Sequence, residues 1–206
     1  MKIKQQKQIK GYLVREFGEE KGTELFSNEE KILNVLIKNT HNKTENQVNT
    51  LITTILPRIA LYKTLLKADL SNEDVHNYMQ NYMINEVAEK KHSSTAKMEL
   101  VPFFYKIYSS IFLKVVRKSD LWVSEQNYGK DYFDVTMKKC LWHTACVENG
   151  CEELCPLFCD VDDITYGGLK KIGFKRTKTL GYGGDCCDFH FYKSSLLWIF
   201  NKKYCV

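Results

Sequence analysis

The chain changes character near residue 120, and this change constrains its fold more than any other feature. Up to about residue 119 there are only two prolines, and the Lys, Glu, Asn, Leu and Ile content is typical of helices. After Asp120, short runs of aromatic and β-branched residues predict strands. We therefore expect an α+β fold: an N-terminal helical lobe (residues 1–119), then a small antiparallel sheet with packed helices (residues 120–206), both in one compact unit.

Helical spacing and capping signals divide the first part. Ser27 and Ser71 each begin a sequence that resembles a capping box and predicts a helix start. Pro57 predicts a kink or a restart within an apolar helix, and Pro102 is expected in the first turns of another. The helices are predicted over about residues 7–17, from 27 onward, 44–67, 71–90 and 98–118.

The second part mixes strands and helices. Strands are predicted over residues 122–126, 132–137, 171–179 and 187–192, with a hairpin turn at 128–131. A helix over 140–149 should stop at Gly150. Pro156 suits the first position of a further helix, with Cys155 as its cap and its end at Gly167. The apolar stretch 196–200 is expected to pack back onto the body of the protein.

Composition excludes several functional classes. The net charge is +5, from 30 basic and 25 acidic residues, and no basic stripe interleaved with aromatic residues stands out. We therefore expect no nucleic-acid partner. No apolar run reaches the ~18 residues that span a membrane, so no membrane partner is expected. Eight cysteines without a secretion signal are typical of reduced thiols, which predicts a cytoplasmic protein.

Seven of the eight cysteines fall between Cys140 and Cys187, and this segment is where we expect the function. Cys159 is expected in the first turn of the helix at Pro156, where the helix dipole lowers the pKa of a thiol. Asp162 and Asp163 share its face at i+3 and i+4, and a thiol beside a carboxylate can act as nucleophile and base. Nearby aspartates oppose the dipole, so an ordinary structural cysteine stays an open alternative.

The predicted strands at 171–179 and 187–192 present a second group of polar residues. Alternation places Arg176 on one face with Ile172 and Phe174, and if that face is the inner one, its guanidinium points into an apolar interior. A buried guanidinium needs an anion, which is either an acid such as Asp188 or a substrate carboxylate. Cys187 is expected to line the same cavity as Arg176. The glycine-rich loop 181–184 between the strands is a flexible turn or a place where a ligand approaches the backbone closely.

Other uses of the thiols remain open. Cys155 and Cys159 are four residues apart and could share a metal ion with Cys187 or His143, although the paired spacing of zinc ribbons is absent. The neighbouring Cys186 and Cys187 could form a redox pair, but adjacent strand residues point to opposite faces. We expect no cofactor and no metal.

These motifs resemble the L-2-amino-thiazoline-4-carboxylic acid hydrolase family over about residues 45–193. The resemblance rests on residues 133–136 (Phe-Asp-Val-Thr) followed by Cys140, on residues 153–159 (Glu-Leu-Cys-Pro-Leu-Phe-Cys) with Asp162, on residues 176–179 (Arg-Thr-Lys-Thr), and on Gly184 with residues 187–189 (Cys-Asp-Phe). Residues 56–66 are similar to an upstream region of the family.

The resemblance implies a hydrolase that opens a small carboxylated heterocycle, such as a 2-aminothiazoline or another cyclic amidine or amide, at a carbon–nitrogen or carbon–sulfur bond. The expected catalytic residues are Cys159 or Cys187 as nucleophile and Asp162 as the group that pairs with the substrate cation or activates water. The expected substrate-binding residues are Arg176, Thr177, Thr179 and Asp188. The alternatives are a small-ligand sensor without chemistry and a thiolate metal-binding protein.

Overall fold

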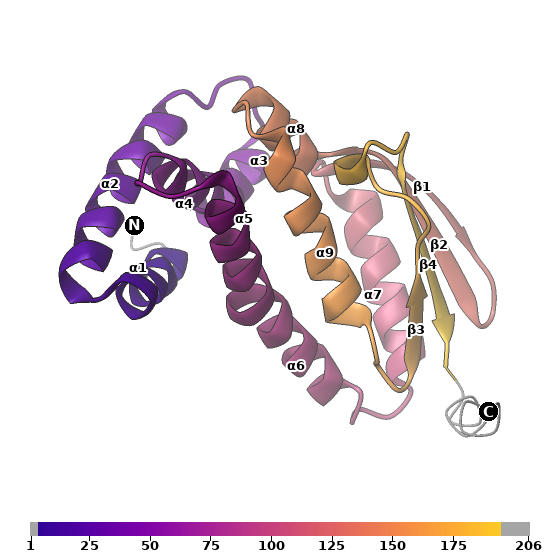
Figure 1. Cartoon of the computed structure of the whole chain (residues 1–206). Coiled ribbons are helices and arrows are strands. Elements are labelled where there is room, and N and C mark those ends of the chain that lie inside the picture. The colour runs from indigo at the N-terminus through magenta and orange to yellow at the C-terminus, as the bar shows by residue number, and fades with distance from the viewer. Residues whose placement is uncertain (1–3, 195–206) are drawn as a thin grey trace. The chain divides into compact units, whose positions relative to one another are not determined.

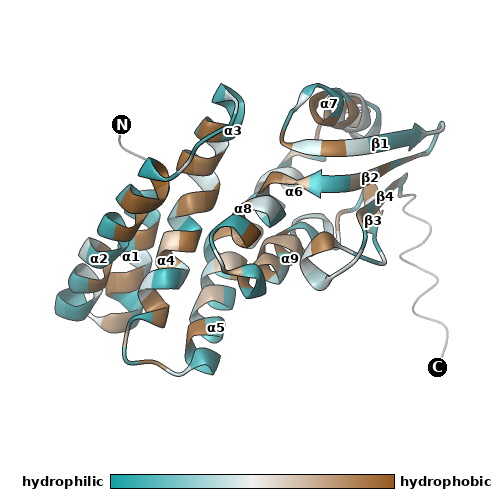
Figure 2. Ribbon diagram, turned by 90° about the horizontal axis from the view of Figure 1, so that it is seen from above, coloured by the Kyte–Doolittle hydropathy of each residue, from teal (hydrophilic) through white to brown (hydrophobic). Residues whose placement is uncertain are grey.

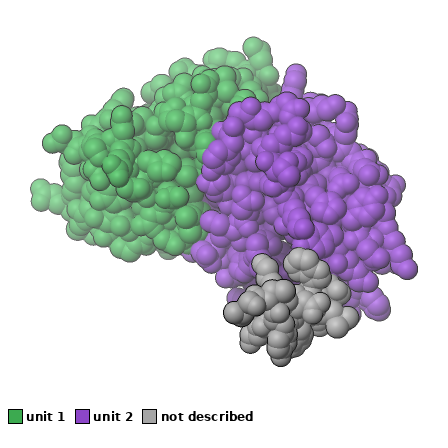
Figure 3. All heavy atoms as spheres, turned by 45° about the vertical axis from the view of Figure 1, so that its right-hand side comes forward, with its two compact units in different colours: residues 1–86, 141–157 green, residues 87–140, 158–206 purple. Residues whose placement is uncertain are grey.

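The computed structural model describes residues 4–194, so the apolar stretch 196–200 lies outside the described part. The chain forms two compact units, coloured separately in Figure 3. Unit 1 comprises residues 1–86 and 141–157, and unit 2 comprises residues 87–140 and 158–206. The strands begin at residue 122, near the expected change at residue 120. The boundaries of the compact units lie elsewhere, because each unit is built from two separate segments of the chain.

Unit 1 is helical. Its elements are α1 (Lys4–Phe17), α2 (Glu19–Lys38), α3 (Glu45–Thr50), a π-helical segment (Leu51–Ile55), α4 (Leu56–Leu66), α5 (Asn72–Asn81), α8 (Leu141–Glu148) and a short 3₁₀ helix (Glu152–Leu154). Apolar and polar residues alternate around α1 and α2 (Figure 2), and fully buried side chains such as Leu13, Ile55, Ile59 and Leu65 form the core. Amphipathic helices of this kind are held mainly by packing of their apolar stripes.

The helix start predicted at Ser27 is wrong, because α2 runs unbroken through that residue. The break lies earlier, at Gly18, whose φ of 80° ends α1 and begins α2. Glu30 is the reciprocal residue of that capping signal, and its neighbour Glu29 is fully buried and accepts a 2.9 Å hydrogen bond from Nε2 of Gln6 on α1. Tertiary packing can override a local capping signal in this way.

The cap predicted at Ser71 and the restart predicted at Pro57 are confirmed. Oγ of Ser71 accepts a 3.1 Å hydrogen bond from the N–H of Asp74 at the start of α5. Thr44 and Gln47 form a reciprocal capping box before α3. Pro57 lies at the start of α4, directly after the π-helical segment, so the missing N–H of proline coincides with an altered hydrogen-bond pattern.

Unit 2 carries the sheet. It contains α6 (Glu89–Met98), α7 (Phe104–Lys118), β1 (Trp122–Tyr128), β2 (Tyr132–Cys140), β3 (Ile172–Lys175) and β4 (Cys187–Lys193), and most of α9 (Cys155–Tyr166). A further π-helical segment, Tyr82–Ala88, joins α5 to α6. The strands pair antiparallel in the order β1-β2-β4-β3 (Figure 1), as the sequence predicts for an α+β fold.

One face of the sheet is apolar and forms the core of unit 2. Phe133 on β2 and Phe191 on β4 are fully buried, with ring centroids 4.7 Å apart. Phe104, Tyr108 and Phe112 of α7 pack against this face, and so does Tyr166 of α9. The alternation predicted for β4 is confirmed, because Cys187, Phe189 and Phe191 are buried while Asp188 and His190 lie on the other face.

The predicted helix from Met98 to Lys118 is interrupted. α6 ends at Met98 and α7 begins only at Phe104, so Pro102 precedes α7 and does not lie in its first turns. Phe103 has a left-handed backbone (φ 55°), which is strained for an aromatic residue. Glu99 helps to hold this break, since its buried carboxylate accepts hydrogen bonds of 2.9 and 2.5 Å from the N–H groups of Lys170 and Lys171.

Within residues 4–194, no helix combines the length and the apolar character needed to cross a membrane.

Candidate active site

Helix α9 positions Cys159, but differently from the prediction. Cys155 has helical dihedral angles (φ −59°, ψ −39°) and follows the 3₁₀ turn Glu152–Leu154 without a break. Cys155 is therefore the first residue of α9, not its cap, and Cys159 is the fifth. The unsatisfied N–H groups of a helix start belong to its first four residues. Cys159 therefore lies one residue beyond the N–H groups on which that prediction depends.

Arg176 connects the end of β3 to this turn of α9. Its Nη2 donates a 3.0 Å hydrogen bond to the backbone oxygen of Cys159 and also pairs with Oδ2 of Asp163. The guanidinium lies over the ring of Phe189, 5.9 Å from its centroid. Arg176 was expected to point into an apolar interior, and its side chain is indeed only 6% exposed. Of the two alternatives, an acid partner is present, and it is Asp163 where Asp188 was the example named.

One nitrogen of this guanidinium has no acceptor. Nη1 of Arg176 is buried and finds no hydrogen-bond partner among the described residues. A buried charged donor without an acceptor is costly, so natural structures rarely leave one unsatisfied. Nη1 of Arg176 therefore keeps an unused capacity to donate to an anion.

Asp162 is electrostatically perturbed. Burial raises its pKa to about 6, and the negative charge of Asp163 adds to this, while Lys91 and Arg176 act in the opposite direction. A carboxyl group with a pKa near 6 exchanges protons readily at neutral pH, as general acids and bases must. Asp162 in turn raises the pKa of Tyr108, which burial already raises to about 12.

A hollow lies on the side of α6 and α9. It has a volume of about 410 Å³ and is lined by Lys90, Lys91, Ser94, Thr95, Thr165 and Tyr166. Lys91 thus belongs both to the wall of this hollow and to the electrostatic surroundings of Asp162.

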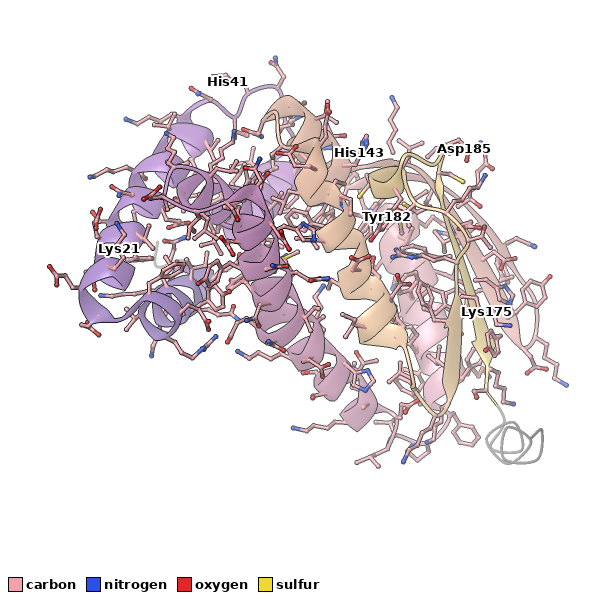
Figure 4. The ribbon with its side chains drawn as sticks, viewed as in Figure 1. Lys21, His41, His143, Lys175, Tyr182 and Asp185 are labelled. Carbon is pink, nitrogen blue, oxygen red and sulfur yellow. The ribbon has the colours of Figure 1, made fainter. Side chains whose placement is uncertain are left out.

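The loop between β3 and β4 adds Tyr182, which sequence reasoning missed. Figure 4 labels Tyr182 and Asp185 in this loop. The hydroxyl of Tyr182 donates a 2.8 Å hydrogen bond to Oδ1 of Asp160 on α9. Burial and this bond raise the pKa of Tyr182 to about 12, with a further contribution from Cys159 and an opposing one from Arg176. A tyrosine in a glycine-rich loop carries no signal that would have singled it out.

The remaining predicted binding residues brace this loop. Asp188 accepts from the N–H and the hydroxyl of Thr177 (2.9 and 2.5 Å) and from the N–H of Lys178 (2.8 Å). Although burial alone raises the pKa of Asp188, these bonds hold it below its usual value. Thr179 is buried, and its hydroxyl oxygen accepts from the N–H of Tyr182 at 3.2 Å. Gly183 supplies the left-handed turn (φ 80°) that completes the loop.

Cys187 has a more enclosed position than Cys159. It is 5% exposed, packs in the core beneath the sheet, and its Sγ accepts a 3.3 Å hydrogen bond from the N–H of Leu180. Cys159 retains partial exposure. Buried structural cysteines are usually inert, so the surroundings favour Cys159 as the reactive thiol.

His190 pairs with an aspartate outside this cluster. Nδ1 of His190 is 2.6 Å from Oδ1 of Asp134, on the face of the sheet opposite Cys187. His143 belongs to α8 in unit 1 (Figure 4).

A second group of thiols lies in unit 1. Cys146, Cys151 and Cys155 are buried, and hydrogen bonds from the other two thiols, together with burial, raise the pKa of Cys146. The bond to Cys146 lowers the pKa of Cys151. No disulfide joins any two cysteines in residues 4–194, and no group of three or more His, Cys, Asp or Glu side chains there is arranged to hold a metal ion.

Comparison with known proteins gives one assignment. A search of curated proteins found no match. The model of the L-2-amino-thiazoline-4-carboxylic acid hydrolase family matches residues 46–191, which include β1 to β3, α9, the Arg176 loop and all but the last two residues of β4. This match covers more than half of the chain, and the chain therefore belongs to the L-2-amino-thiazoline-4-carboxylic acid hydrolase family.

Proposed function

We propose that this protein hydrolyses a small carboxylated heterocycle of the 2-aminothiazoline type, with Cys159 as nucleophile, Asp162 as proton acceptor and Arg176 as the group that binds the substrate carboxylate. Family membership supports the hydrolase class and the kind of substrate. Two positions support the roles. Cys159 and Asp162 lie three residues apart on α9, and Arg176 donates a hydrogen bond to the backbone oxygen of Cys159.

The observation that carries this proposal is the buried guanidinium of Arg176, which has one nitrogen without an acceptor within residues 4–194. Its side chain is 6% exposed and fixed by Cys159 and Asp163 through Nη2, while Nη1 lacks an acceptor among the described residues. A substrate carboxylate would supply that acceptor, and bidentate binding by an arginine also fixes orientation. The bound ring would then lie beside the turn that bears Cys159 and Asp162.

The reaction follows from the electrophilic carbon C2 of the ring. Cys159 sulfur forms a bond to C2, the ring C2–S bond breaks, and the ring sulfur leaves as a thiol after taking a proton. Water then adds to the resulting isothiourea carbon and the bond to Cys159 breaks, which yields a carbamoyl-cysteine and restores the thiol. Asp162, ionised above about pH 6, accepts the proton of that water.

The other predicted residues take supporting roles in this proposal. Asp188, Thr177 and Thr179 hold the loop that follows Arg176, so they position the guanidinium and the substrate. Cys187 is the alternative nucleophile, disfavoured by its burial. Thiolate chemistry needs a reduced cysteine, and we therefore also propose a cytoplasmic location, where thiols stay reduced.

Turnover of two substrates tests the proposal. We would compare 2-amino-thiazoline-4-carboxylic acid with 2-aminothiazoline, which lacks the carboxylate, and follow product by chromatography after an acid quench. Arg176→Gln should lower kcat/KM for the carboxylated substrate by about 10- to 100-fold, mainly through KM, because a hydrogen bond to a charged group is lost. The same variant should change the poor turnover of 2-aminothiazoline by less than about threefold.

Lys175→Gln is the matched control, because Lys175 is an exposed cation beside Arg176 in sequence and has no assigned role. It should leave both substrates unaffected. Equal losses on the two substrates in Arg176→Gln would show that Arg176 serves only the fold, and no turnover by the wild-type protein would remove the proposed substrate class.

A further inference from the structure

A second cavity lies in unit 2, away from Arg176 and Cys159. Its volume is about 900 Å³, and it is lined by α7, by the β1–β2 hairpin and by the chain near Lys171 and Ser194. The predicted hairpin turn at residues 128–131 forms part of its wall. None of the residues assigned above to the hydrolytic site lines it.

The cavity is apolar at its base. Phe104 and Phe133 are 4% and 0% exposed and belong to the core beneath the sheet, and Leu113 of α7 packs against that core. Aromatic and aliphatic side chains of this kind are typical of small-ligand cavities, which bury most of the surface of the ligand. An occupant should therefore have an apolar body.

The surroundings of the cavity are strongly basic. Six cationic side chains line it: Lys106, Lys114, Arg117, Lys130, Lys171 and Lys193. Asp131 is the lining residue that carries a carboxylate, and its Oδ1 lies 3.7 Å from Nζ of Lys193. Among residues 4–194, Lys106, Lys114 and Lys130 have no carboxylate partner within ion-pair distance. Several cations around one concavity focus a positive potential that attracts anions.

Two further donors belong to this cavity. The hydroxyl of Tyr105 is buried and has no hydrogen-bond partner among the described residues, and burial raises its pKa to about 12, so the phenol keeps its proton. α7 also begins at this cavity without a side-chain cap, because Phe103 occupies the N-cap position. Uncapped N–H groups at a helix start add to the preference for an anion.

We infer that this cavity is a binding site for a small amphiphilic anion: a molecule with an apolar body and one carboxylate, sulfonate or phosphate group. The apolar base would hold the body, and Lys106, Lys114 and the Tyr105 hydroxyl would hold the anionic group. The alternative occupant is the segment of residues 195–206. Its sequence contains Lys202 and Lys203, so charge favours an anion over that segment.

A matched pair of fluorescent probes tests this inference on the full chain. 1-Anilinonaphthalene-8-sulfonate and N-phenyl-1-naphthylamine share the same aromatic body, and the first carries a sulfonate. The sulfonate probe should bind saturably at one site, at least about tenfold more tightly than the neutral probe, and added salt should weaken only the sulfonate probe. The double variant Lys106→Gln/Lys114→Gln should weaken the sulfonate probe by about fivefold or more and leave the neutral probe unchanged.

Lys139→Gln is the control, since Lys139 is an exposed lysine of β2 that does not line the cavity. Equal affinity for both probes would mean that the cavity is merely apolar and would overturn the inference. So would the absence of saturable binding, which is the result expected if residues 195–206 fill the cavity. Co-sedimentation with phosphatidylglycerol vesicles, without binding of the sulfonate probe, would assign this surface to a membrane instead.

Discussion

Replacing Asp162 with asparagine removes the charge that the proposed mechanism needs while keeping the size of the side chain. Burial raises the pKa of Asp162 to about 6, against the opposing charges of Lys91 and Arg176. In the proposal the ionised carboxylate accepts a proton from water. Activity should therefore rise with pH through the pKa of this group, and the asparagine variant should lack that rise.

The size of the effect follows from the pKa. A group with a pKa near 6 is about nine-tenths ionised at pH 7 and about one-tenth ionised at pH 5, so kcat/KM should fall about tenfold between these values. Asp162→Asn should lower kcat/KM at pH 7 by about 10²- to 10⁴-fold, the usual contribution of a positioned acid or base.

The neighbours of Asp162 give a sharper test, because they act in opposite directions. Lys91 lowers the pKa of Asp162, so Lys91→Gln should move the rising limb to higher pH. Asp163 raises it, so Asp163→Asn should move the limb to lower pH. We would measure kcat/KM from pH 4.5 to 8.5 for all four proteins. A limb that persists in Asp162→Asn, or that stays fixed in both neighbour variants, would refute the assignment.

Two predictions concern unit 1. Burial raises the pKa of Glu29 from about 4.5 to about 7, so its protonated form favours the folded state and Glu29 should contribute a fall of about 3 kcal/mol in the unfolding free energy as pH rises from 4 to 8. In urea unfolding of Glu29→Gln the fall over this range should be about 3 kcal/mol smaller than in the wild type, and a slope equal to that of the wild type would contradict this. A Cβ on Gly22 would lie 2.5 Å from the backbone of Val14, so Gly22→Ala should destabilise by about 1–3 kcal/mol. Gly11→Ala, with no atom within 4 Å, should stabilise by about 0.5–1 kcal/mol, and equal thermal shifts would argue against the close contact.

Local signals in the sequence predicted those parts of the fold that local interactions decide. Ser71 caps α5 because its hydroxyl needs only the N–H of a residue three positions later. Gly150 ends α8 with a φ of 58°, as its freedom from a Cβ allows. Ser27 begins a similar signal, yet α2 runs through it, and the nearby Glu29 contacts Gln6 of α1, a tertiary contact that no local signal contains.

In the candidate site, too, the sequence predicted what local structure decides and did not predict what depends on tertiary contacts. Alternation along one strand predicted the burial of Arg176, since the period of a strand is local. Its partner could not be predicted, because β3 ends at Lys175 and the choice of Asp163 over Asp188 depends on how α9 packs against the sheet. Tyr182 was missed for the same reason, as its bond to Asp160 joins the loop to a helix 22 positions earlier.

Trapping a covalent intermediate tests the central claim most directly. Intact-protein mass spectrometry after a millisecond acid quench should show an adduct equal to the full mass of 2-amino-thiazoline-4-carboxylic acid, because ring opening at sulfur expels no fragment. Peptide mapping should place the adduct on Cys159, and Cys159→Ala should lose it together with turnover, while Cys187→Ala keeps both. Full turnover by Cys159→Ala, or an adduct on another cysteine, would contradict the account.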